Sequence, residues 1–324
     1  MVSSLGGPSR AYDGRVTVTD DVLAERFGEH RTRLIGVAYR LTSRLSDAED
    51  AVQEAWLRLS GLDDRQRAEI RELGAWLTTV VGRICLDRLR SAAERRERYV
   101  GPWLPEPIVT PLGGRPGGDD PLETIVRTED VRLAAMVVLD RLTPEQRVAF
   151  VLHDAFDVPF AEIAGILGVA EATARQHASR GRRAAADAGP PPRTAVDEQR
   201  AVLERLVAAI VGGDLDTVVR LLHPDAVLTG DSDGKARTAR QVMVGSDKIG
   251  RFLAGLFRQY GAHRVDAGEL VLVNGDLGMA FPNIPADGEY RALDRRITGF
   301  AVRDGLVTAI YDIVNPDKLT HLDF

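Results

Sequence analysis

The sequence has a single cysteine and no long apolar segment. Because Cys85 stands alone, an intrachain disulfide is excluded, and so is a metal site built on several thiolates. No apolar run approaches the roughly 20 residues that a membrane helix needs. The Ser-, Gly- and Pro-rich start also lacks the apolar core of a signal peptide. We therefore expect a cytoplasmic protein that does not enter a membrane and that needs no metal or other cofactor.

Lysine is also scarce. Of the 42 basic residues only Lys235, Lys248 and Lys318 are lysines, and all three lie in the C-terminal part. Arginine suits phosphate and guanine because its planar guanidinium donates two parallel hydrogen bonds, although a GC-rich genome would give the same bias. The formal net charge of -6 argues against coating nucleic acid by bulk charge, but it allows local basic surfaces.

Two breaks rich in proline and glycine divide the chain. The segment 99–120 holds five prolines, and Gly189 is followed by three more. Neither segment can continue a regular helix, so both indicate linkers. The predicted parts are a disordered leader over 1–19, a first domain over 20–98, a linker over 99–120, a second domain over 121–187, a linker over 188–194 and a third domain over 195–324.

The first two domains have the periodicity of helices. Val52, Ala55, Trp56 and Leu59 recur at the spacing of one helical face. The spacing of Ser46 and Glu49 predicts a capping box at the start of that helix, and Thr143 to Gln146 predicts another helix start with proline in the first turn.

The third domain changes from helices to strands. Residues 197–211 and 215–222 read as helices, and short alternating runs follow over 270–273, 297–302 and 306–313. Asp304-Gly305 predicts a tight hairpin between the last two runs. In that register Phe300 and Val302 would share a face with Val307 and Ala309. This domain is therefore expected to be α+β, with helices packed on a curved antiparallel sheet.

The segment 160–183 has the pattern of a helix-turn-helix. Ala164 is small where two helices must approach, and Gly168 follows where the turn needs a permissive backbone. A helix with this basic face can enter the major groove of DNA, although an ordinary helical hairpin with a solvated face would look similar. The candidate DNA-contacting residues of the second helix are Arg175, Gln176, Ser179, Arg180, Arg182 and Arg183.

Two further surfaces lie in the first domain. Asp50, Gln53 and Glu54 form a polar face opposite the apolar one on the helix 47–59, and alone this would be read as solvated surface. The helix that follows is basic and has aromatic neighbours, which suits a DNA backbone or an unstacked strand. Its candidate residues are Trp76, Arg83, Arg88, Arg90, Arg95 and Arg96.

Together and in this order, these segments resemble the extracytoplasmic-function class of bacterial RNA polymerase sigma factors. Residues 47–58 resemble region 2.2, residues 75–90 are similar to regions 2.3 and 2.4, and residues 142–183 resemble region 4. The resemblance implies two all-α domains, a helical bundle and a helix-turn-helix. It implies that Asp50, Gln53 and Glu54 bind the β′ clamp helices of core RNA polymerase. The β subunit of the polymerase is a second expected partner. It further implies that the two basic helices read the minus-10 and minus-35 elements of promoter DNA.

Three further motifs resemble the subgroup whose C-terminal extension is a SnoaL-like cone. They are residues 99–107 in the linker, residues 231–235, and residues 315–319 near the C-terminus, and Ser232 and Asp233 stand where that subgroup has glycines. The resemblance implies that the extension regulates sigma activity in cis through these motifs. The implied contact residues are Trp103, Leu104, Pro105, Glu106, Pro107, Asp231, Gly234, Lys235, Asn315, Pro316, Asp317, Lys318 and Leu319.

Two rival interpretations remain. The third domain could be an enzyme, since SnoaL-like folds include acid–base catalysts in a conical pocket, or it could hold an unknown small ligand. The chain could also be a repressor that binds DNA without polymerase, which the polar face of the helix 47–59 argues against. The candidate acid–base groups are His223, Asp225, His263, Asp266 and Asp312, each of which could equally be a turn or surface residue.

Overall fold

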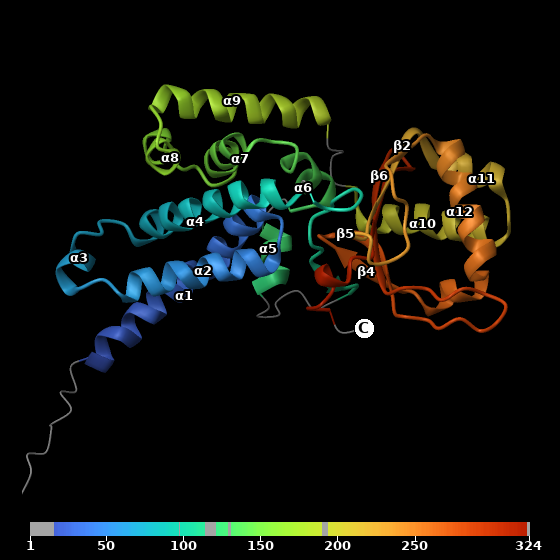
Figure 1. Cartoon of the computed structure of the whole chain (residues 1–324), viewed down its shortest axis with the longest axis horizontal. Coiled ribbons are helices and arrows are strands. Elements are labelled where there is room, and N and C mark those ends of the chain that lie inside the picture. Colours follow the sequence, from blue (N-terminus) through green and yellow to red (C-terminus); the bar gives the residue numbers. More distant parts are fainter. Residues whose placement is uncertain (1–15, 97, 114–120, 129–130, 190–193, 323–324) are drawn as a thin grey trace, which may run out of the picture.

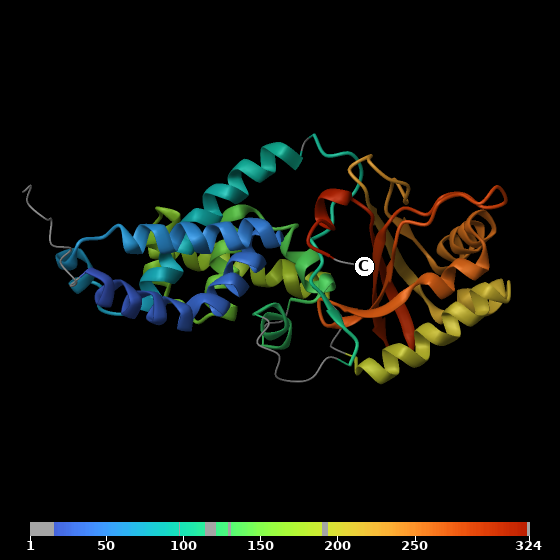
Figure 2. The ribbon, with the colours of Figure 1, turned by 90° about the horizontal axis from the view of Figure 1, so that it is seen from below.

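The structure is a computed structural model that describes residues 16–96, 98–113, 121–128, 131–189 and 194–322. A helical half and a half built on a β-sheet lie side by side, and the segment 98–113 runs between them (Figures 1 and 2). Among the described residues no helix is long and apolar enough to cross a membrane.

The first domain is an all-helical unit. Its first helix already begins at Val16, so the predicted leader 1–19 is too long by four residues, and residues 1–15 lie outside the described part. The buried positions of the second helix include Val52, Ala55 and Leu59, which confirms the predicted apolar face. The helices are α1 (Val16–Thr42), α2 (Leu45–Ser60), α3 (Asp64–Ala68) and α4 (Leu73–Arg96).

The predicted capping box at Ser46 is wrong. Helix α2 begins two residues earlier than predicted, at Leu45 instead of Asp47, and its N-cap Arg44 makes no side-chain cap hydrogen bond. Leu45 is itself buried, and its backbone N–H donates to Oε2 of Glu106 at 3.0 Å. The free N–H group at this helix start is therefore satisfied by the linker rather than by the helix's own sequence.

The second domain is also all-helical. The predicted helix start at Thr143 is confirmed, because Thr143 and Gln146 form a reciprocal capping box with Pro144 in the first turn. Gly168 adopts the left-handed conformation that the turn of the helix-turn-helix needs, at φ 68°. The elements are α5 (Pro121–Thr128), α6 (Leu133–Leu139), α7 (Pro144–Phe150), a π-helical turn η1 (Val151–Ala155), α8 (Phe160–Leu167) and α9 (Glu171–Ala188).

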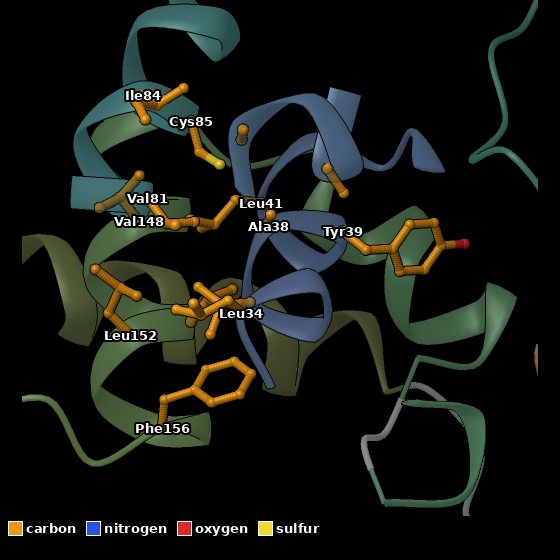
Figure 3. Close-up of a cluster of buried hydrophobic side chains, with 14 of the residues drawn as sticks. Leu34, Ala38, Tyr39, Leu41, Val81, Ile84, Cys85, Val148, Leu152 and Phe156 are labelled. Carbon is orange, nitrogen blue, oxygen red and sulfur yellow. The ribbon is translucent and has the colours of Figure 1, made fainter. Parts of the chain in front are cut away.

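The two helical domains share one hydrophobic core. Side chains of α1 and α4 from the first domain meet side chains of α7 and η1 from the second (Figure 3). Burial here raises the pKa of the Cys85 thiol to about 12, which keeps this cysteine protonated and unreactive. The two helical domains, which the sequence indicated to be joined by a linker, therefore also pack directly on each other. The core residues labelled in Figure 3 are Leu34, Ala38, Tyr39, Leu41, Val81, Ile84, Cys85, Val148, Leu152 and Phe156.

The third domain is α+β, as expected. Within the described ranges its sheet has seven strands in the order β1-β4-β5-β6-β7-β2-β3, and only the β2–β7 pairing is parallel. Helices α10 (Val196–Val211), α11 (Leu215–Leu221) and α12 (Ser246–Tyr260) cover one face. The strands are β1 (Val109–Pro111), β2 (Leu222–Asp231), β3 (Met243–Val244), β4 (Glu269–Val273), β5 (Asp276–Phe281), β6 (Arg296–Arg303) and β7 (Leu306–Ile313).

The predicted hairpin between β6 and β7 is confirmed, but its predicted register is partly wrong. Asp304 and Gly305 both have positive φ, at 53° and 72°, as a tight hairpin turn requires. Ala301 pairs with Ala309, but the next residue, Val302, pairs with Val307, so β7 carries one extra residue between Val307 and Ala309. Ala309 therefore lies with Ala301 on one face, and Phe300, Val302 and Val307 lie on the other.

The second face of the sheet is covered by α6 and the linker. Leu104 of the linker and Leu133 of α6 are buried with strand residues in one cluster. Gly299 of β6 allows this close approach, since a Cβ there would lie 2.8 Å from the Leu133 side chain. Residues 109–111 of the predicted linker form β1, which pairs with β4. The described part of the linker is thus an integral piece of the third domain, and it is not a free tether.

Candidate functional site

The polar face of α2 is open to solvent. Asp50 is 72% exposed and Glu54 is 41% exposed at their side chains, and Gln53 lies between them on the same face. Leu57, one turn further on, is 59% exposed although it is a large apolar residue. Our sequence reasoning missed Leu57. The available signal was its position off the apolar stripe, since a helical leucine off the buried face has no core to fill.

Arg88 lies beneath this polar face rather than beside the other basic residues of α4. Its guanidinium donates to the Asp47 carbonyl at 3.1 Å and lies 3.6 Å from carboxylate oxygens of Asp47 and Asp50. A further contact reaches Glu54 at 3.9 Å. Arg88 therefore ties α4 to α2 and holds the acidic groups in place, which is a different environment from the one expected for a DNA-contacting residue.

Two other basic residues of α4, Arg83 and Arg90, contact the second domain. Arg83 donates to the carbonyl of Gly165 in α8 at 3.2 Å, and Arg90 pairs with Glu145 of α7 at 3.1 Å. Both arginines remain exposed, whereas Trp76 is half-buried against the shared core. The side chains of Arg95 and Arg96 lie outside the described part of the structure.

The second helix of the helix-turn-helix, α9, presents its predicted residues to solvent. Ala174 and Ala178 face the core, and the six polar candidates are all exposed on the remaining surface. Arg175 pairs with Glu171 and stacks over the Phe160 ring at 4.7 Å. The exposed candidates are Arg175, Gln176, Ser179, Arg180, Arg182 and Arg183.

The three motifs of the linker and third domain meet at the carboxylate of Asp231. This buried group accepts the Leu104 N–H at 2.6 Å, the Tyr99 hydroxyl and the Lys318 ammonium at 2.6 Å. The Lys318 side chain is 1% exposed and the Asp231 side chain 0% exposed, so the charges compensate one another inside the protein. Asn315 completes the cluster by donating to the Tyr99 hydroxyl at 2.7 Å.

Burial and neighbouring charge perturb this cluster. Burial lowers the pKa of Lys318 to about 8, and the Asp231 carboxylate opposes that change. Burial, followed by the charge of Asp231, raises the pKa of Tyr99 well above its usual value, so Tyr99 stays a hydrogen-bond donor. The Lys318 ammonium also lies 3.9 Å from the centre of the Trp103 ring and donates to the Leu104 carbonyl. The predicted contacts of Trp103 and Leu104 are thus brought together with Asp231.

The rest of the predicted contact set lies around this cluster. Lys235 bonds Asp317 at 2.5 Å at the surface, and Asp233 lies 3.1 Å from the same ammonium. Asp233 has φ 50° where the related motif carries glycine. This is a left-handed backbone conformation, which glycine adopts more easily than aspartate. Pro105, Pro107 and Leu319 are buried, whereas Pro316 is exposed; Gly234 lies against Val100 of the linker.

Glu106 joins the linker to the first and third domains, and Asn274 adds a contact to the second. Besides Leu45 of α2, the Glu106 carboxylate bonds Nδ1 of His321 at 3.1 Å, and the Glu106 carbonyl accepts the Tyr39 hydroxyl at 2.7 Å. Asn274 donates to that same hydroxyl at 2.8 Å and to the Val131 carbonyl at 2.7 Å. Sequence reasoning found Glu106 but missed Tyr39, Asn274 and His321. We call Glu106, Tyr39, Asn274 and His321 the junction.

The candidate acid–base groups of the third domain do not converge. Asp312 lines a cavity between the helices and the sheet, whereas the other four do not line it. Nδ1 of His223 accepts the Asp225 N–H at 3.1 Å, and Asp266 is exposed in the 3-10 turn η2 (Ala262–Ala267). His263 is exposed and lies 3.9 Å from Asp287. The structure therefore brings together no acid–base pair from this set.

Comparisons with known proteins agree with the resemblance found in the sequence. Family models match sigma-70 region 2 over residues 27–95, sigma-70 region 4 over 132–184 and a SnoaL-like domain over 203–310. The ECF RNA polymerase sigma factor SigJ of Mycobacterium tuberculosis is 55% identical over 293 residues, covering 90% of this chain and 91% of the relative. A probable ECF sigma factor, SigI of the same species, is 33% identical over 71% of this chain and 75% of the relative.

A solved structure supports the same assignment. The crystal structure of M. tuberculosis SigJ matches with a TM-score of 0.76 and 51% identity, over 92% of this chain and 98% of that one. The fold, the order of the domains and the identity thus agree along almost the whole chain. This chain belongs to the extracytoplasmic-function family of RNA polymerase sigma factors, with a SnoaL-like C-terminal domain.

Proposed function

We propose that this sigma factor docks on core RNA polymerase through the α2 face, reads promoter DNA through α4 and α9, and is regulated in cis by its SnoaL-like domain. The role in transcription initiation follows from the family. The residue assignments and the regulation are our proposal. Because a complex of this sigma factor with RNA polymerase would transcribe chromosomal DNA, we place the protein in the cytoplasm.

The docking proposal rests on the exposed face of α2. Asp50, Gln53 and Glu54 offer charged and polar groups around the exposed side chain of Leu57. Interfaces commonly have an apolar centre and a polar rim. Arg88 holds the acidic side chains in position from below, so the face is ordered before its partner arrives.

The proposal of promoter recognition rests on the exposed arginines of α9 and α4. The first turns of α9 carry Arg175 and Gln176, and the later turns carry Arg182 and Arg183, which suits base edges followed by phosphates. On α4, the exposed Arg83 and Arg90 supply positive charge, and the half-buried Trp76 lies on the same helix. No covalent chemistry is required of any of these residues.

The cis regulation rests on one observation, the buried carboxylate of Asp231. It holds the linker through Leu104 and Tyr99 and holds the C-terminal segment through Lys318. Because the next linker residues include Glu106, which caps α2, this carboxylate fixes the linker between the sigma domains and the third domain. We therefore assign to the SnoaL-like domain the role of limiting how far the two promoter-reading helices can move relative to each other.

The experiment is promoter-specific transcription with core polymerase on templates whose minus-35 to minus-10 spacing varies. Wild-type protein should show a narrow optimum of spacing. Asp231→Asn removes the charge but keeps the shape, and it should broaden the optimum and lower its peak. Asp304→Asn, in the exposed β6–β7 turn, is the matched control and should behave as wild type. Identical spacing profiles for Asp231→Asn and wild type would disprove the regulatory part of the proposal.

A further inference from the structure

A cavity of about 320 Å³ lies where the first domain, the linker and the third domain meet, apart from the one that Asp312 lines. Small-molecule sites occur preferentially between domains, because groups from several segments converge there. The charged residues among those that line it are three cations and three carboxylates: Arg44 and Asp47 of the first domain, Arg98 of the linker, and Asp233, Asp317 and Lys318 of the third domain.

The three cations are compensated unequally. Lys318 is paired with the buried Asp231 at 2.6 Å. Arg44 lies 3.7 Å from Asp47, which is too long for a hydrogen bond, and its buried Nε has no hydrogen-bond partner among the described residues. Arg98 is exposed and forms no ion pair within the described ranges. Two guanidinium groups therefore border the cavity with donors for which the protein supplies no acceptor.

The carboxylates are also compensated unequally. Asp47 lies 3.6 Å from the guanidinium of Arg88. Asp233 and Asp317, by contrast, share the single ammonium of Lys235, at 3.1 Å and 2.5 Å. The side chain of Asp317 is 59% exposed, so it remains open to a second cation. The cavity therefore has unused donors on the side of the first domain and linker, and spare acceptors on the side of the third domain.

These charges favour a ligand that carries both signs. A planar guanidinium donates two parallel hydrogen bonds to a carboxylate, and an ammonium group donates up to three hydrogen bonds. An anion alone would be repelled by Asp233 and Asp317, and a cation alone would be repelled by Arg44 and Arg98. A zwitterion avoids both repulsions, because each of its ends can face the opposite charge.

The volume and the aromatic residues of the wall define the rest of the ligand. A cavity of about 150 Å³ holds benzene, so one of about 320 Å³ holds roughly a dozen non-hydrogen atoms. The half-buried side chains of Tyr99 and Trp103 line the same space. Aromatic side chains offer a large apolar surface on which another ring or an aliphatic chain can pack.

We propose that this cavity binds a free α-amino acid with an aromatic or large aliphatic side chain. The carboxylate of the ligand accepts from Arg44 and Arg98, its ammonium donates to Asp317 and Asp233, and its side chain packs on Trp103. The bound amino acid thereby connects the first domain to the third. Binding does not rest on the proposed cis regulation, since it requires neither DNA nor polymerase, whereas an effect of the ligand on transcription would.

The test is isothermal titration calorimetry on the full-length chain, with L-phenylalanine and L-leucine as probes. Two analogues each lack one charged end: 3-phenylpropionate has no ammonium, and L-phenylalaninamide has no carboxylate. Each analogue should bind about tenfold more weakly than L-phenylalanine, because it loses hydrogen bonds between charged groups. Saturable binding of neither amino acid would overturn the proposal, and so would equal affinities for L-phenylalanine and both analogues.

Variants of two exposed residues test the two ends of the ligand separately. Arg98→Gln should weaken binding of L-phenylalanine about tenfold and leave L-phenylalaninamide unchanged, because that analogue has no carboxylate. Asp317→Asn should weaken L-phenylalanine by a similar factor and leave 3-phenylpropionate unchanged, because that analogue has no ammonium. Arg65→Gln and Asp304→Asn, whose side chains are each 90% exposed, are the matched controls and should bind as wild type. Equal weakening of all three ligands in both variants would show a purely structural effect and refute the site, as would undiminished binding of L-phenylalanine in both.

Discussion

Replacement of Glu106 tests the junction between the domains most directly. The carboxylate serves two partners, the Leu45 N–H at 3.0 Å and Nδ1 of His321 at 3.1 Å. Glu106→Gln keeps the shape of the side chain and one carbonyl oxygen that can accept from Leu45. The interaction that is mainly lost is therefore the one with His321. A hydrogen bond to a charged group is worth roughly 1.5–3 kcal/mol, and we expect the free energy of unfolding to fall by about 2 kcal/mol at pH 6.

The loss of unfolding free energy caused by Glu106→Gln should become smaller as the pH rises. Burial lowers the pKa of His321, but the hydrogen bond and charge of Glu106 raise it further, so the pKa lies above its usual value. A group whose pKa is raised by folding adds stability that is complete below its ordinary pKa of about 6.5 and disappears as the pH passes the folded value. Because solvent reaches part of His321, this contribution is about 1 kcal/mol. Wild-type protein should therefore lose stability above pH 6.5, and Glu106→Gln should show a flatter profile.

Thermal unfolding at pH 6 and pH 8.5 measures both effects. A change of 1 kcal/mol shifts the midpoint of a domain of 150–250 residues by about 2–4 °C, so Glu106→Gln should melt about 4–8 °C lower at pH 6. Glu269→Gln, an exposed residue of β4, is the control and should not shift the midpoint. Equal losses of melting temperature at both pH values, or none at either, would refute the reasoning.

Two predictions concern the binding surfaces. Glu54→Arg should abolish capture by core polymerase in a pull-down, whereas the equally charge-reversing Glu69→Arg, on an exposed residue after α3, should leave capture intact; equal loss in both would count against the α2 assignment. In electrophoretic mobility shifts with minus-35 duplexes, Arg175→Ala should relax the preference at one base position. Arg182→Ala should weaken binding to all sequences and reduce the salt slope by about one. Effects of the two variants that cannot be told apart would contradict this division of roles.

Local structure was largely predictable from the sequence, because its causes lie within a few residues. The helix start at Thr143, the left-handed turn at Gly168 and the hairpin at Asp304 each follow from residue types that fix a backbone conformation. Two features were missed. Helix α2 begins at Leu45, whose backbone N–H donates to Glu106 of the distant linker, and one extra residue in β7, between Val307 and Ala309, places Ala309 on the other face.

The contacts between domains could not be derived from the sequence, because their partners are far apart along the chain. Lys318 donates to the carbonyl of Leu104, 214 positions away. A motif that contains one of these residues does not indicate which distant residue it contacts. Tyr39 and Asn274 were missed for a similar reason. A tyrosine in a helix and an asparagine in a turn are ordinary residues until the fold places them against Glu106 and Val131.

The packing of α4 on the second domain decides how promoter DNA can reach its arginines. Arg83 makes one hydrogen bond at 3.2 Å and Arg90 one ion pair at 3.1 Å, and both are exposed. Exposed pairs of this kind are worth at most about 1 kcal/mol, so phosphates can replace these partners easily. The apolar contact is different, because Gly82 lies against Ile166 and Leu152 within the shared core. Exchanging the partners of these arginines therefore costs little free energy, whereas separating the two helical domains would break their shared core.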